Sequence, residues 1–499
     1  MKNALLSITD KRGIIPLAKK LIELGWHLYA TSSTESYLQN HAVPCTAISA
    51  ITKFPEILQG RVKTLHPIIH GGLLTRRTPE DDQTLQQFNI PEFSLAVINL
   101  YPFEEFLEKN PAASTEEVLD YMDIGGPAMI RSAIKNYKHV IALTDPADYD
   151  LFISYLIEGQ DSFTETMRLH FATKAAQLIM QYDLAIAKFF SRIDKQSNCL
   201  RYGENPHQLP AYFIPSVPAQ GIALATFHQG KQLSYNNYLD IDSGCALVYS
   251  LSALTSACSI IKHGNPCGVA YAPTNKESYQ LAYRSDPESA FGGIICFNKP
   301  LDADTAQEIV TTQFCEVVIA PSVDEQSLAI FKQKPSIRVV SIPHYQIARQ
   351  DIRTVAGGYL LQPNDSITSS EIQFPADISQ VNKLNCELAW SVATIAKSNA
   401  IVIVSNLQTI AISCGFTSRV RATEQALLRF LSHPSVTSEV VLASDGFFPF
   451  ADSIELIAKH SAIKIVIQPK GSIRDAEVSE ACRTYGILQL YASRRHFRH

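Results

Sequence analysis

Ala4-Leu5-Leu6-Ser7-Ile8 is a short apolar run, and a second one, His27-Leu28-Tyr29-Ala30-Thr31, lies a helix length further along the chain. Between them, apolar residues recur with helical spacing over residues 12–24, which predicts an amphipathic helix. A strand, a helix and a further strand in this order are typical of a parallel, doubly wound sheet. The stretch therefore predicts an α/β fold whose ligands bind at the carboxyl ends of the strands.

The same alternation continues further along the chain. Leu95-Ala96-Val97-Ile98-Asn99 and His139-Val140-Ile141-Ala142-Leu143 predict further strands, and residues 163–190 predict a long helix that closes this part of the fold.

The domain organisation follows from length and from one polar segment. A chain of 499 residues is too long for one ordinary core. Residues 191–198 are polar and predict a linker, and the part beyond them predicts a larger α/β region with polar loops rich in Gly and Pro. We therefore expect two domains, residues 1–195 and residues 200–499.

Hydroxyl side chains stand at or just past the ends of the first two predicted strands: Ser7, Thr9, Thr31 and Ser32-Ser33-Thr34. Hydroxyls followed by helix N-termini can form a phosphate site, because the first turn of a helix presents free N–H groups. The same residue types are also ordinary helix N-caps. The pattern alone leaves both interpretations open.

The composition narrows the class of protein. The formal net charge of -5 gives no basic surface for nucleic acid, so an anionic small substrate would need a local cationic pocket. The ten cysteines include no CxxC pair, and the chain begins Met1-Lys2-Asn3 without a secretory apolar region. No apolar run reaches the length of a membrane span. We therefore expect a cytoplasmic protein with reduced thiols, no metal site, and no nucleic-acid or membrane partner.

Polar blocks in the N-terminal domain carry charged and phenolic side chains. Arg61 and Lys63 lie two residues apart, and on an extended stretch they would point to the same side. Tyr101 follows a predicted strand, and Asp123 enters a predicted helix on which Lys135 lies. Such a set would suit binding an anion and moving one proton. Each of these residues is individually also common on a protein surface.

A further polar block, Lys262-His263-Gly264-Asn265-Pro266-Cys267-Gly268, follows an apolar run at 257–261. The proline restricts the backbone of this loop and the glycines allow it to turn. Such a loop can present a histidine as a general base and a lysine as a cation at a cleft. A solvated surface loop has the same composition. The final segment, 495–499, is rich in Arg, His and Phe, and is either a frayed end or a segment docked at a site.

Eight blocks together resemble a known family: KTLHP (63–67), NLYPF (99–103), DIGG (123–126), RYGENPHQ (201–208), KHGNPCG (262–268), KSNA (397–400), SDGFFPF (444–450) and RHFRH (495–499). Their joint occurrence in this order is highly specific. Nearly end to end, the chain resembles the bifunctional purine biosynthesis enzymes with AICAR formyltransferase and IMP cyclohydrolase activities. The resemblance implies an N-terminal methylglyoxal-synthase-like, Rossmann-type domain and a C-terminal region of two cytidine-deaminase-like α/β subdomains. It also implies an intertwined homodimer in the cytoplasm.

By this resemblance, the C-terminal domain transfers a formyl group from the cosubstrate 10-formyltetrahydrofolate to the 5-amino group of AICAR. That amine is conjugated and weakly nucleophilic, so the reaction needs a base, and a cation for the charge that develops on the formyl oxygen. The resemblance gives these roles to His263 and Lys262, with Asn399 orienting the amine or the formyl oxygen. The other matching residues bind substrates: Arg201, Tyr202, His207, Asn237, Glu316 and Arg495 the nucleotide, and Phe291, Asp445, Phe448 and Pro449 the folate.

The resemblance also implies that the N-terminal domain closes formyl-AICAR to IMP. The carboxamide nitrogen attacks the formyl carbon and water is lost, which needs only a folded substrate and proton transfer, without cofactor or metal. The matching catalytic residues are Lys63, Tyr101, Asp123 and Lys135. The residues matched to binding of the phosphate and the base are Ser7, Thr9, Lys11, Thr31 and Arg61.

Two stretches depart from the family pattern. Ser32-Ser33 precedes Thr34 where the family has Gly-Gly, and glycine there would allow a positive φ beside a phosphate. Residues 410–419 read IAISCGFTSR where the family has the form IGIGAGQxSR. The second change places Ser413, Cys414 and Phe416 in a signature region of the formyltransferase. We expect it to weaken use of the formyl donor more than nucleotide binding; the alternative is that neighbouring residues have repacked and nothing is lost.

Two alternatives to the two-step enzyme remain. The altered 410–419 stretch would allow a protein that keeps only one of the two activities. The N-terminal fold also serves as an effector-sensing module, which would allow a non-catalytic nucleotide-binding or regulatory protein. Binding alone does not need an acid–base set, so an enzyme is favoured by Lys63, Asp123, Lys135 and the Lys262-His263 pair.

Overall fold

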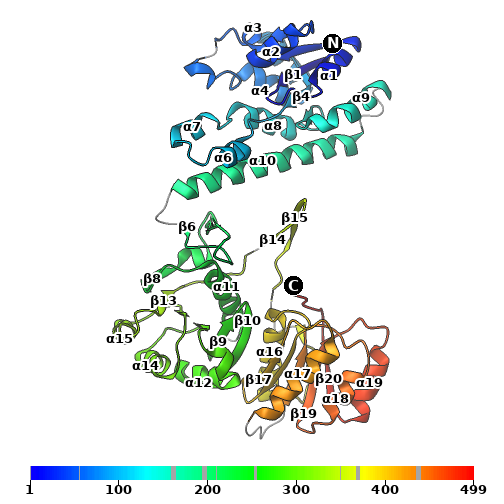
Figure 1. Cartoon of the computed structure of the whole chain (residues 1–499). Helices are drawn as coiled ribbons and strands as arrows, with labels where there is room; N and C mark the ends of the chain where they lie inside the picture. Colours follow the sequence, from blue (N-terminus) through cyan, green and yellow to red (C-terminus); the bar gives the residue numbers. More distant parts are fainter. Residues whose placement is uncertain are drawn as a thin grey trace. The chain divides into compact units, whose positions relative to one another are not determined.

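The computed structural model describes residues 2–55, 57–158, 164–193, 199–209, 211–251, 255–348, 350–366, 371–433 and 440–499. The chain divides into two compact units, residues 1–195 (unit 1) and residues 196–499 (unit 2), and each is described by itself (Figure 1). The segment 194–198, part of the predicted linker, lies outside the described residues.

Unit 1 is built on a five-stranded sheet in the order β3-β2-β1-β4-β5. Its strands are β1 (Lys2–Ser7), β2 (Trp26–Ala30), β3 (Thr46–Ala47), β4 (Phe93–Ile98) and β5 (Ile141–Leu143). Every neighbouring pair is parallel, which confirms the predicted α/β fold class. The chain reverses its direction of travel across the sheet between β1 and β4, and such a switch point leaves a crevice at the carboxyl ends of the strands.

Helices cover both faces of this sheet. Apolar side chains of β1 point alternately to one face and to the other, so both faces have to be buried. Ala4 and Leu6 pack into a core with α1 (Ile14–Glu23) and α9 (Tyr149–Glu158), whereas Leu5 packs on the opposite face. The helices of that opposite face are α4 (Pro67–Leu74), α8 (Gly125–Lys135) and α10 (Glu165–Ile193). The other helices of unit 1 are α2 (Ser32–Asn40), α3 (Ile48–Thr52), α5 (Pro79–Gln87), α6 (Phe103–Lys109) and α7 (Thr115–Asp120).

Unit 2 is built on an eleven-stranded mixed sheet in the order β20-β19-β18-β16-β17-β10-β9-β11-β12-β13-β8. Its strands are β8 (Thr226–Gln229), β9 (Ser256–Lys262), β10 (Asn265–Ala272), β11 (Ile294–Phe297), β12 (Val317–Ala320), β13 (Arg338–Ser341), β16 (Ile401–Ser405), β17 (Gln408–Ser413), β18 (Val440–Ser444), β19 (Ile463–Pro469) and β20 (Leu488–Ala492).

This sheet contains one arrangement twice. The first repeat (residues 235–341) has the strand order β10-β9-β11-β12-β13, and the second repeat (residues 380–492) has the order β17-β16-β18-β19-β20, with the same parallel and antiparallel pairs. The repeats meet where β10 pairs antiparallel with β17. Two α/β halves were expected in this region, and the sheet has two.

Helices of the two repeats also correspond. Each repeat opens with a 16-residue helix that packs into a shared core, α11 (Tyr235–Ser250) and α16 (Gln380–Ile395). After the first strand pair come α12 (Asn275–Ser285) and α17 (Arg419–Ser432), each packed on its own half of the sheet. The smaller helices are α13 (Pro287–Ala290), α14 (Ala303–Thr312), α15 (Glu325–Phe331), α18 (Asp452–Ala458) and α19 (Asp475–Thr484).

Two smaller elements complete unit 2. The strands β6 (Cys199–Leu200) and β7 (Ala211–Tyr212) form a short ribbon, and β14 (Gln350–Val355) with β15 (Gly358–Pro363) forms an antiparallel hairpin that projects from the rest of the unit (Figure 1). Among the described residues, no helix is both long enough and apolar enough to span a membrane.

Candidate functional sites

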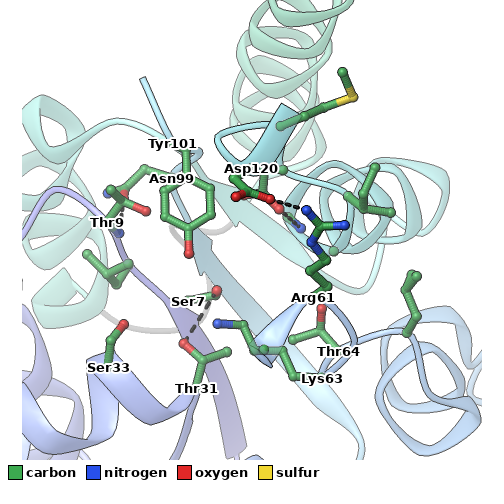
Figure 2. Close-up of a pocket in the computed structure, with 18 of the residues that line it drawn as sticks. Ser7, Thr9, Thr31, Ser33, Arg61, Lys63, Thr64, Asn99, Tyr101 and Asp120 are labelled. Carbon is green, nitrogen blue, oxygen red and sulfur yellow. Dashed lines mark hydrogen bonds and ion pairs between the residues drawn. The ribbon is translucent and has the colours of Figure 1, made fainter. Parts of the chain in front are cut away.

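A cavity of about 440 Å³ opens at the carboxyl ends of β1 and β2 in unit 1, beside the switch point between β1 and β4. This volume is within the usual range for small-molecule sites. Seven of the residues predicted for this domain line it: Ser7, Thr9, Thr31, Arg61, Lys63, Tyr101 and Asp123. In Figure 2 the Lys63 amine, the Tyr101 phenol and the Ser7 and Thr31 hydroxyls converge on one space.

The structure bears on one of the two interpretations of the hydroxyl residues, helix capping, at Thr31. Thr31 occupies the N-cap position of α2, yet its side chain makes no capping hydrogen bond. Its hydroxyl lies 3.5 Å from Ser7 Oγ and 3.3 Å from Thr34 Oγ1, and Thr34 Oγ1 accepts a hydrogen bond from the Ile8 N–H at 2.9 Å. The hydroxyls therefore join the ends of β1 and β2 around the cavity. Capping is not the role of the Thr31 side chain.

The replacement of the family's Gly-Gly by Ser32-Ser33 does not strain the backbone. Both serines lie inside α2, and neither has a positive φ. Because no left-handed backbone is required here, serine carries no conformational penalty relative to glycine.

Lys63 lines this cavity, and Lys11 is anchored beside it on the backbone of Ile8. Lys11 donates to the Ile8 carbonyl and lies 3.3 Å from Thr34 Oγ1. Burial, together with the neighbouring charge of Lys63, lowers the pKa of Lys11. Folding two cations together in this way is unfavourable unless an anion sits between them, so the pair suits a phosphate.

Asp123 lies just before α8, and the first two residues of that helix, Gly125 and Gly126, have no room for a side chain. The Gly126 N–H donates to Asp123 Oδ1 at 2.8 Å, and a Cβ at Gly126 would lie 2.5 Å from Asp123 Oδ2. A Cβ at Gly125 would lie 2.0 Å from Thr64 Oγ1. Burial raises the pKa of Asp123, against the Gly126 hydrogen bond and the charge of Lys63, and a raised pKa suits a carboxyl that exchanges a proton.

Sequence reasoning missed two contributors to this cavity. Asn99 accepts hydrogen bonds from the Thr9 N–H at 2.5 Å and the Asp10 N–H at 2.9 Å, and so holds the loop after β1. Asp120 forms an ion pair with Arg61. A buried asparagine ending an apolar strand was the available signal for Asn99, whereas nothing in the local sequence connects Asp120 with Arg61.

Lys135 is not brought to this cavity within one chain. It is exposed at the far end of α8, whereas Asp123 precedes the first residue of that helix. At a rise of about 1.5 Å per residue, the length of α8 separates the two side chains by roughly 15 Å. Within one chain Lys135 therefore lies apart from Asp123, and its predicted catalytic role stays a prediction.

In unit 2, Lys262 and His263 line a cavity of about 300 Å³ between the β9–β10 turn, β17 and α17. His263 and Gly264 form a two-residue turn in which both have positive φ, of 54° and 74°. The Lys262 amine donates to the Phe291 carbonyl at 2.8 Å, and the predicted folate residue Phe291 is itself exposed. The pair thus stands at a cleft, as predicted from its loop.

The altered 410–419 stretch lines the same cavity. Ser413, Cys414 and Phe416 all face the space next to the Lys262-His263 turn. The Ser413 hydroxyl is buried and finds no hydrogen-bond partner among the described residues. A buried hydroxyl without a partner lowers the stability of the folded state, so a residue without a hydroxyl would be more favourable at this position.

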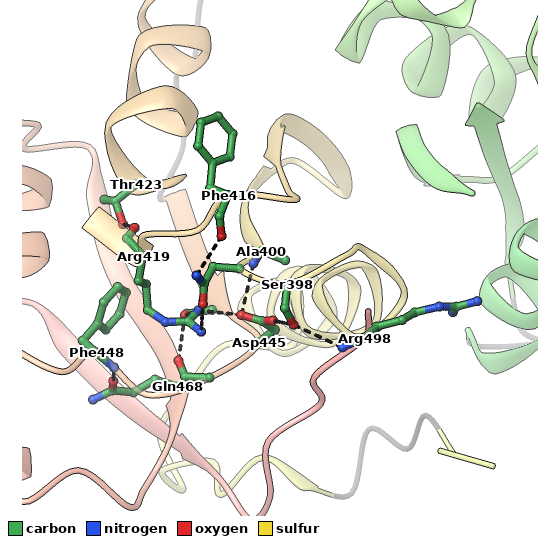
Figure 3. A network of polar contacts seen from close by, with 12 residues as sticks. Ser398, Ala400, Phe416, Arg419, Thr423, Asp445, Phe448, Gln468 and Arg498 are labelled. Carbon is green, nitrogen blue, oxygen red and sulfur yellow. Dashed lines mark hydrogen bonds and ion pairs between the residues drawn. The ribbon is translucent and has the colours of Figure 1, made fainter. Parts of the chain in front are cut away.

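Asn399 belongs to a polar network with Arg419 and the backbone of Phe416, a residue that lines the cavity; Figure 3 shows this network. The Asn399 amide donates to the Phe416 carbonyl at 2.8 Å and accepts from Arg419 at 2.6 Å. Arg419 in turn forms a buried ion pair with Asp445. Arg419 was not predicted as a site residue, yet its guanidinium fixes the Asn399 side chain.

Asp445 and Phe448, which were predicted to contact the folate, are both buried, and their folate contacts stay a prediction. Asp445 is completely buried and accepts hydrogen bonds from Ser398 Oγ, the Ala400 N–H and Arg419. Phe448 is completely buried in the core of the second repeat. Both residues organise the loop after β18, and of this block only Pro449 keeps a half-exposed position among the predicted residues.

The segment 494–499 docks on the same network. The Ser398 N–H donates to the Arg498 carbonyl at 2.9 Å, and the buried His496 bridges Asp365 and Glu371. Burial opposes the charged form of His496, but the hydrogen bonds to these two carboxylates outweigh it and raise the pKa of the imidazole. Of the two alternatives for this segment, docking is therefore the observed one. Arg495 itself stays exposed, over the Phe497 ring.

The residues predicted to hold the nucleotide form a separate group. Asn237, near the start of α11, donates to Glu316 at 3.2 Å, and Glu316 pairs with Arg338 at 3.1 Å. Arg201, Tyr202 and His207 lie in the loop between β6 and β7, which is tied to α11 by a hydrogen bond from Asn236 to the Glu204 carbonyl. None of these residues lines the 300 Å³ cavity within one chain.

No group of three or more His, Cys, Asp or Glu side chains among the described residues is arranged to hold a metal ion.

Comparisons with known proteins agree over the whole length. Residues 133–429 match the family model described as AICARFT/IMPCHase bienzyme, and residues 13–128 match that of the MGS-like domain. A protein from Aquifex aeolicus (strain VF5), named "Bifunctional purine biosynthesis protein PurH", is 41% identical, over 99% of this chain and 100% of its own. A protein of the same name from Persephonella marina is 40% identical over 100% of both chains. A solved structure titled "Crystal structure of ForH" is 36% identical, covers 38% of this chain and 97% of its own, and has a TM-score of 0.34.

Proposed function

The chain belongs to the AICARFT/IMPCHase bienzyme family and is an enzyme of purine biosynthesis with formyltransferase and IMP cyclohydrolase activities, and we propose that formyl transfer takes place in unit 2 and ring closure in unit 1. The observation that carries this assignment is that each unit gathers its own acid–base set in its own cavity. Two separate reactions need two such sets, whereas a regulatory nucleotide-binding protein needs none.

In unit 2, we propose that AICAR and 10-formyltetrahydrofolate meet at the Lys262-His263 turn. His263 removes the proton of the attacking amine, and Lys262 stabilises the charge on the formyl oxygen. Asn399, held by Arg419, orients one of the reacting groups. Because Lys262 also donates to the Phe291 carbonyl, its amine is already positioned before substrate binds, which lowers the cost of reaching the transition state.

In unit 1, we propose that formyl-AICAR binds with its phosphate near Ser7, Thr31 and the two lysines, Lys11 and Lys63. Ring closure then requires a folded substrate and removal of a proton from the carboxamide nitrogen. Asp123, whose pKa is raised by burial, together with Tyr101 supplies proton-exchanging groups on the opposite wall.

A coupled assay that follows tetrahydrofolate release and IMP appearance tests the function as a whole. Both products are expected from AICAR and 10-formyltetrahydrofolate. Tetrahydrofolate release with no IMP would indicate a protein with formyl transfer alone, and IMP formed only from added formyl-AICAR would indicate ring closure alone. Binding of AICAR with neither product would make the protein a nucleotide sensor.

The altered wall of the unit 2 cavity gives a prediction about the formyl donor. Restoring the family residues by Ser413→Gly, Cys414→Ala and Phe416→Gln removes side-chain volume and the unpaired Ser413 hydroxyl. Overpacking of this kind typically costs about 1–3 kcal/mol. The KM for 10-formyltetrahydrofolate is therefore expected to fall by roughly 5- to 150-fold, while the KM for AICAR changes little. A folded triple variant with an unchanged folate KM would indicate that neighbouring residues have repacked around the new side chains.

We further propose a homodimer in which each formyltransferase site is completed by the partner. The β14–β15 hairpin supports this, because its apolar side chains Ile352, Leu360 and Leu361 are 62%, 59% and 61% exposed. Exposed apolar surface of this kind is typical of an interface. The residues predicted to bind the nucleotide do not line the Lys262-His263 cavity within one chain, which also supports a site completed by a second chain.

Sedimentation is expected to give twice the 55.2 kDa of one chain. Charging the hairpin by Ile352→Lys with Leu361→Lys should produce monomers that lose formyl transfer and keep ring closure. Lys332→Ala, on an exposed position of the same unit, is a control that should leave the dimer intact. A fully active monomer would contradict the proposal.

We place the protein in the cytoplasm, with small molecules as its partners besides its own second copy: AICAR, formyl-AICAR, IMP and folate. All ten cysteines are free, which suits a reducing compartment.

A further inference from the structure

The two repeats of unit 2 contain the same tight turn at equivalent positions. In the first repeat, His263 and Gly264 connect β9 and β10, with φ of 54° and 74°. In the second, Asn406 and Leu407 connect β16 and β17, with φ of 51° and 60°. Positive φ is unfavourable for residues other than glycine, so neither turn is set by its local sequence alone.

Each turn is held by a side chain from the helix that opens its repeat. Asp240 of α11 accepts a hydrogen bond from the Gly264 N–H through Oδ1 at 2.5 Å. Asn385 of α16 accepts one from the Leu407 N–H through Oδ1 at 2.8 Å. The same backbone amide of the same turn thus meets an oxygen acceptor from the same helix in both repeats, which identifies the contact as a fixed part of this architecture.

The chemistry of the two turns differs although their geometry agrees. The first turn carries Lys262 and His263 at the 300 Å³ cavity, whereas the equivalent residues of the second turn are Ser405 and Asn406. The second repeat therefore provides an internal comparison. It has the same turn and the same kind of anchor, but no lysine–histidine pair to position.

We propose that Asp240 is a positioning residue for formyl transfer, which fixes the Lys262-His263 turn so that both side chains face the cavity. This inference rests on the proposed function of unit 2. His263 occupies an unfavourable left-handed conformation, and the neighbouring amide would lose its acceptor if Asp240 were absent. A relaxed turn would move the imidazole away from the attacking amine, and a displacement of about 1 Å from the reacting atoms can cost roughly 100-fold in rate.

An oxygen acceptor, rather than a negative charge, is what the turn requires, because Asn385 holds the second turn with a neutral amide. Burial raises the pKa of Asp240, opposed by the Gly264 hydrogen bond and by His263. The asparagine variant Asp240→Asn should therefore preserve the contact, whereas Asp240→Ala removes it.

The experiment compares formyl transfer in four full-length variants: Asp240→Ala, Asp240→Asn, Asn385→Ala and His263→Ala. Each rate is divided by the ring-closure rate of the same preparation, and Tm is recorded. Asp240→Ala is expected to lower kcat by about 10- to 100-fold with the KM for AICAR nearly unchanged, and Asp240→Asn to stay within about threefold of wild type. Asn385→Ala should lower Tm about as much as Asp240→Ala and leave kcat unchanged.

Three outcomes would overturn the inference: a normal kcat in Asp240→Ala, an equal loss in Asn385→Ala, or an equal loss in Asp240→Asn. The second would indicate a general effect on the fold, and the third a role for charge. If Asp240→Ala does not fold, Asp240→Ser replaces it, because its shorter side chain does not reach the Gly264 amide. His263→Ala distinguishes failure of the Asp240 inference from failure of the proposed function, because an active His263→Ala would contradict the proposed site itself.

Discussion

Replacing His263 with alanine is expected to slow formyl transfer by roughly 10²–10⁴-fold, the usual loss when a general base is removed. The imidazole stands on a two-residue turn at the edge of the unit 2 cavity, and among the residues that the structure describes no other histidine lines that space. Lys262→Ala is expected to act on the same step, because it removes the cation for the formyl oxygen. Formation of formyl-AICAR from AICAR, followed by single-turnover kinetics, measures both effects.

The control for this prediction is His344→Ala, since His344 is an exposed histidine of the same unit outside the cavity. That variant should match wild type in both steps. Ring closure from added formyl-AICAR should be normal in every one of these variants, because distant and independent sites behave additively. Formyl-AICAR formed by His263→Ala at a rate near wild type would rule out the assignment of the base.

Lys63→Ala and Asp123→Asn are expected to reduce conversion of formyl-AICAR to IMP by about 10²–10⁴-fold. Lys63 lines the unit 1 cavity, so its loss is expected to weaken binding of the phosphate or stabilisation of a developing charge. Asp123→Asn keeps an oxygen for the Gly126 N–H and removes the group that exchanges a proton. The measurement feeds formyl-AICAR directly to each variant and follows IMP.

A carboxylate outside the cavity supplies the matched control for unit 1. Asp183 forms an exposed ion pair with Arg131, and pairs of this kind contribute little. Asp183→Asn should therefore leave ring closure unchanged. Unimpaired IMP formation in both Lys63→Ala and Asp123→Asn would mean that the reaction takes place elsewhere, and formyl transfer in these variants should stay normal in either case.

The periodicity of apolar residues was sufficient to predict most strands of unit 1. Residues 4–8 and 27–31 became β1 and β2, each shifted by one or two residues. The two-residue strand β3 was missed, because two residues are too few to show a period. Periodicity did not indicate the two halves of unit 2, which were expected from the family resemblance and which the sheet contains.

Site residues near one another in the sequence were easier to place than those that meet only on folding. The Lys262-His263 pair was predicted at a cleft and lines one. Asp445 and Phe448 were predicted at the folate slot, yet they are buried, because a polar or aromatic residue after a strand can face either the core or a cleft. Arg419 and Asn99 act through side-chain hydrogen bonds to distant residues, for which the sequence carries no spacing signal.

Features that depend on local and periodic order could be predicted from the sequence alone: most strands and helices of unit 1, the hydroxyls at strand ends, and the blocks that identify the family. Which of those groups share a cavity became clear only from the folded structure. Lys63 lines the unit 1 cavity and Lys11 is anchored beside it, whereas Lys135 lies at the far end of α8. The folded structure also shows that Asp240 holds the His263 turn. Such contacts join residues far apart in the chain, and their geometry follows from how sheets and helices pack rather than from any neighbouring residue.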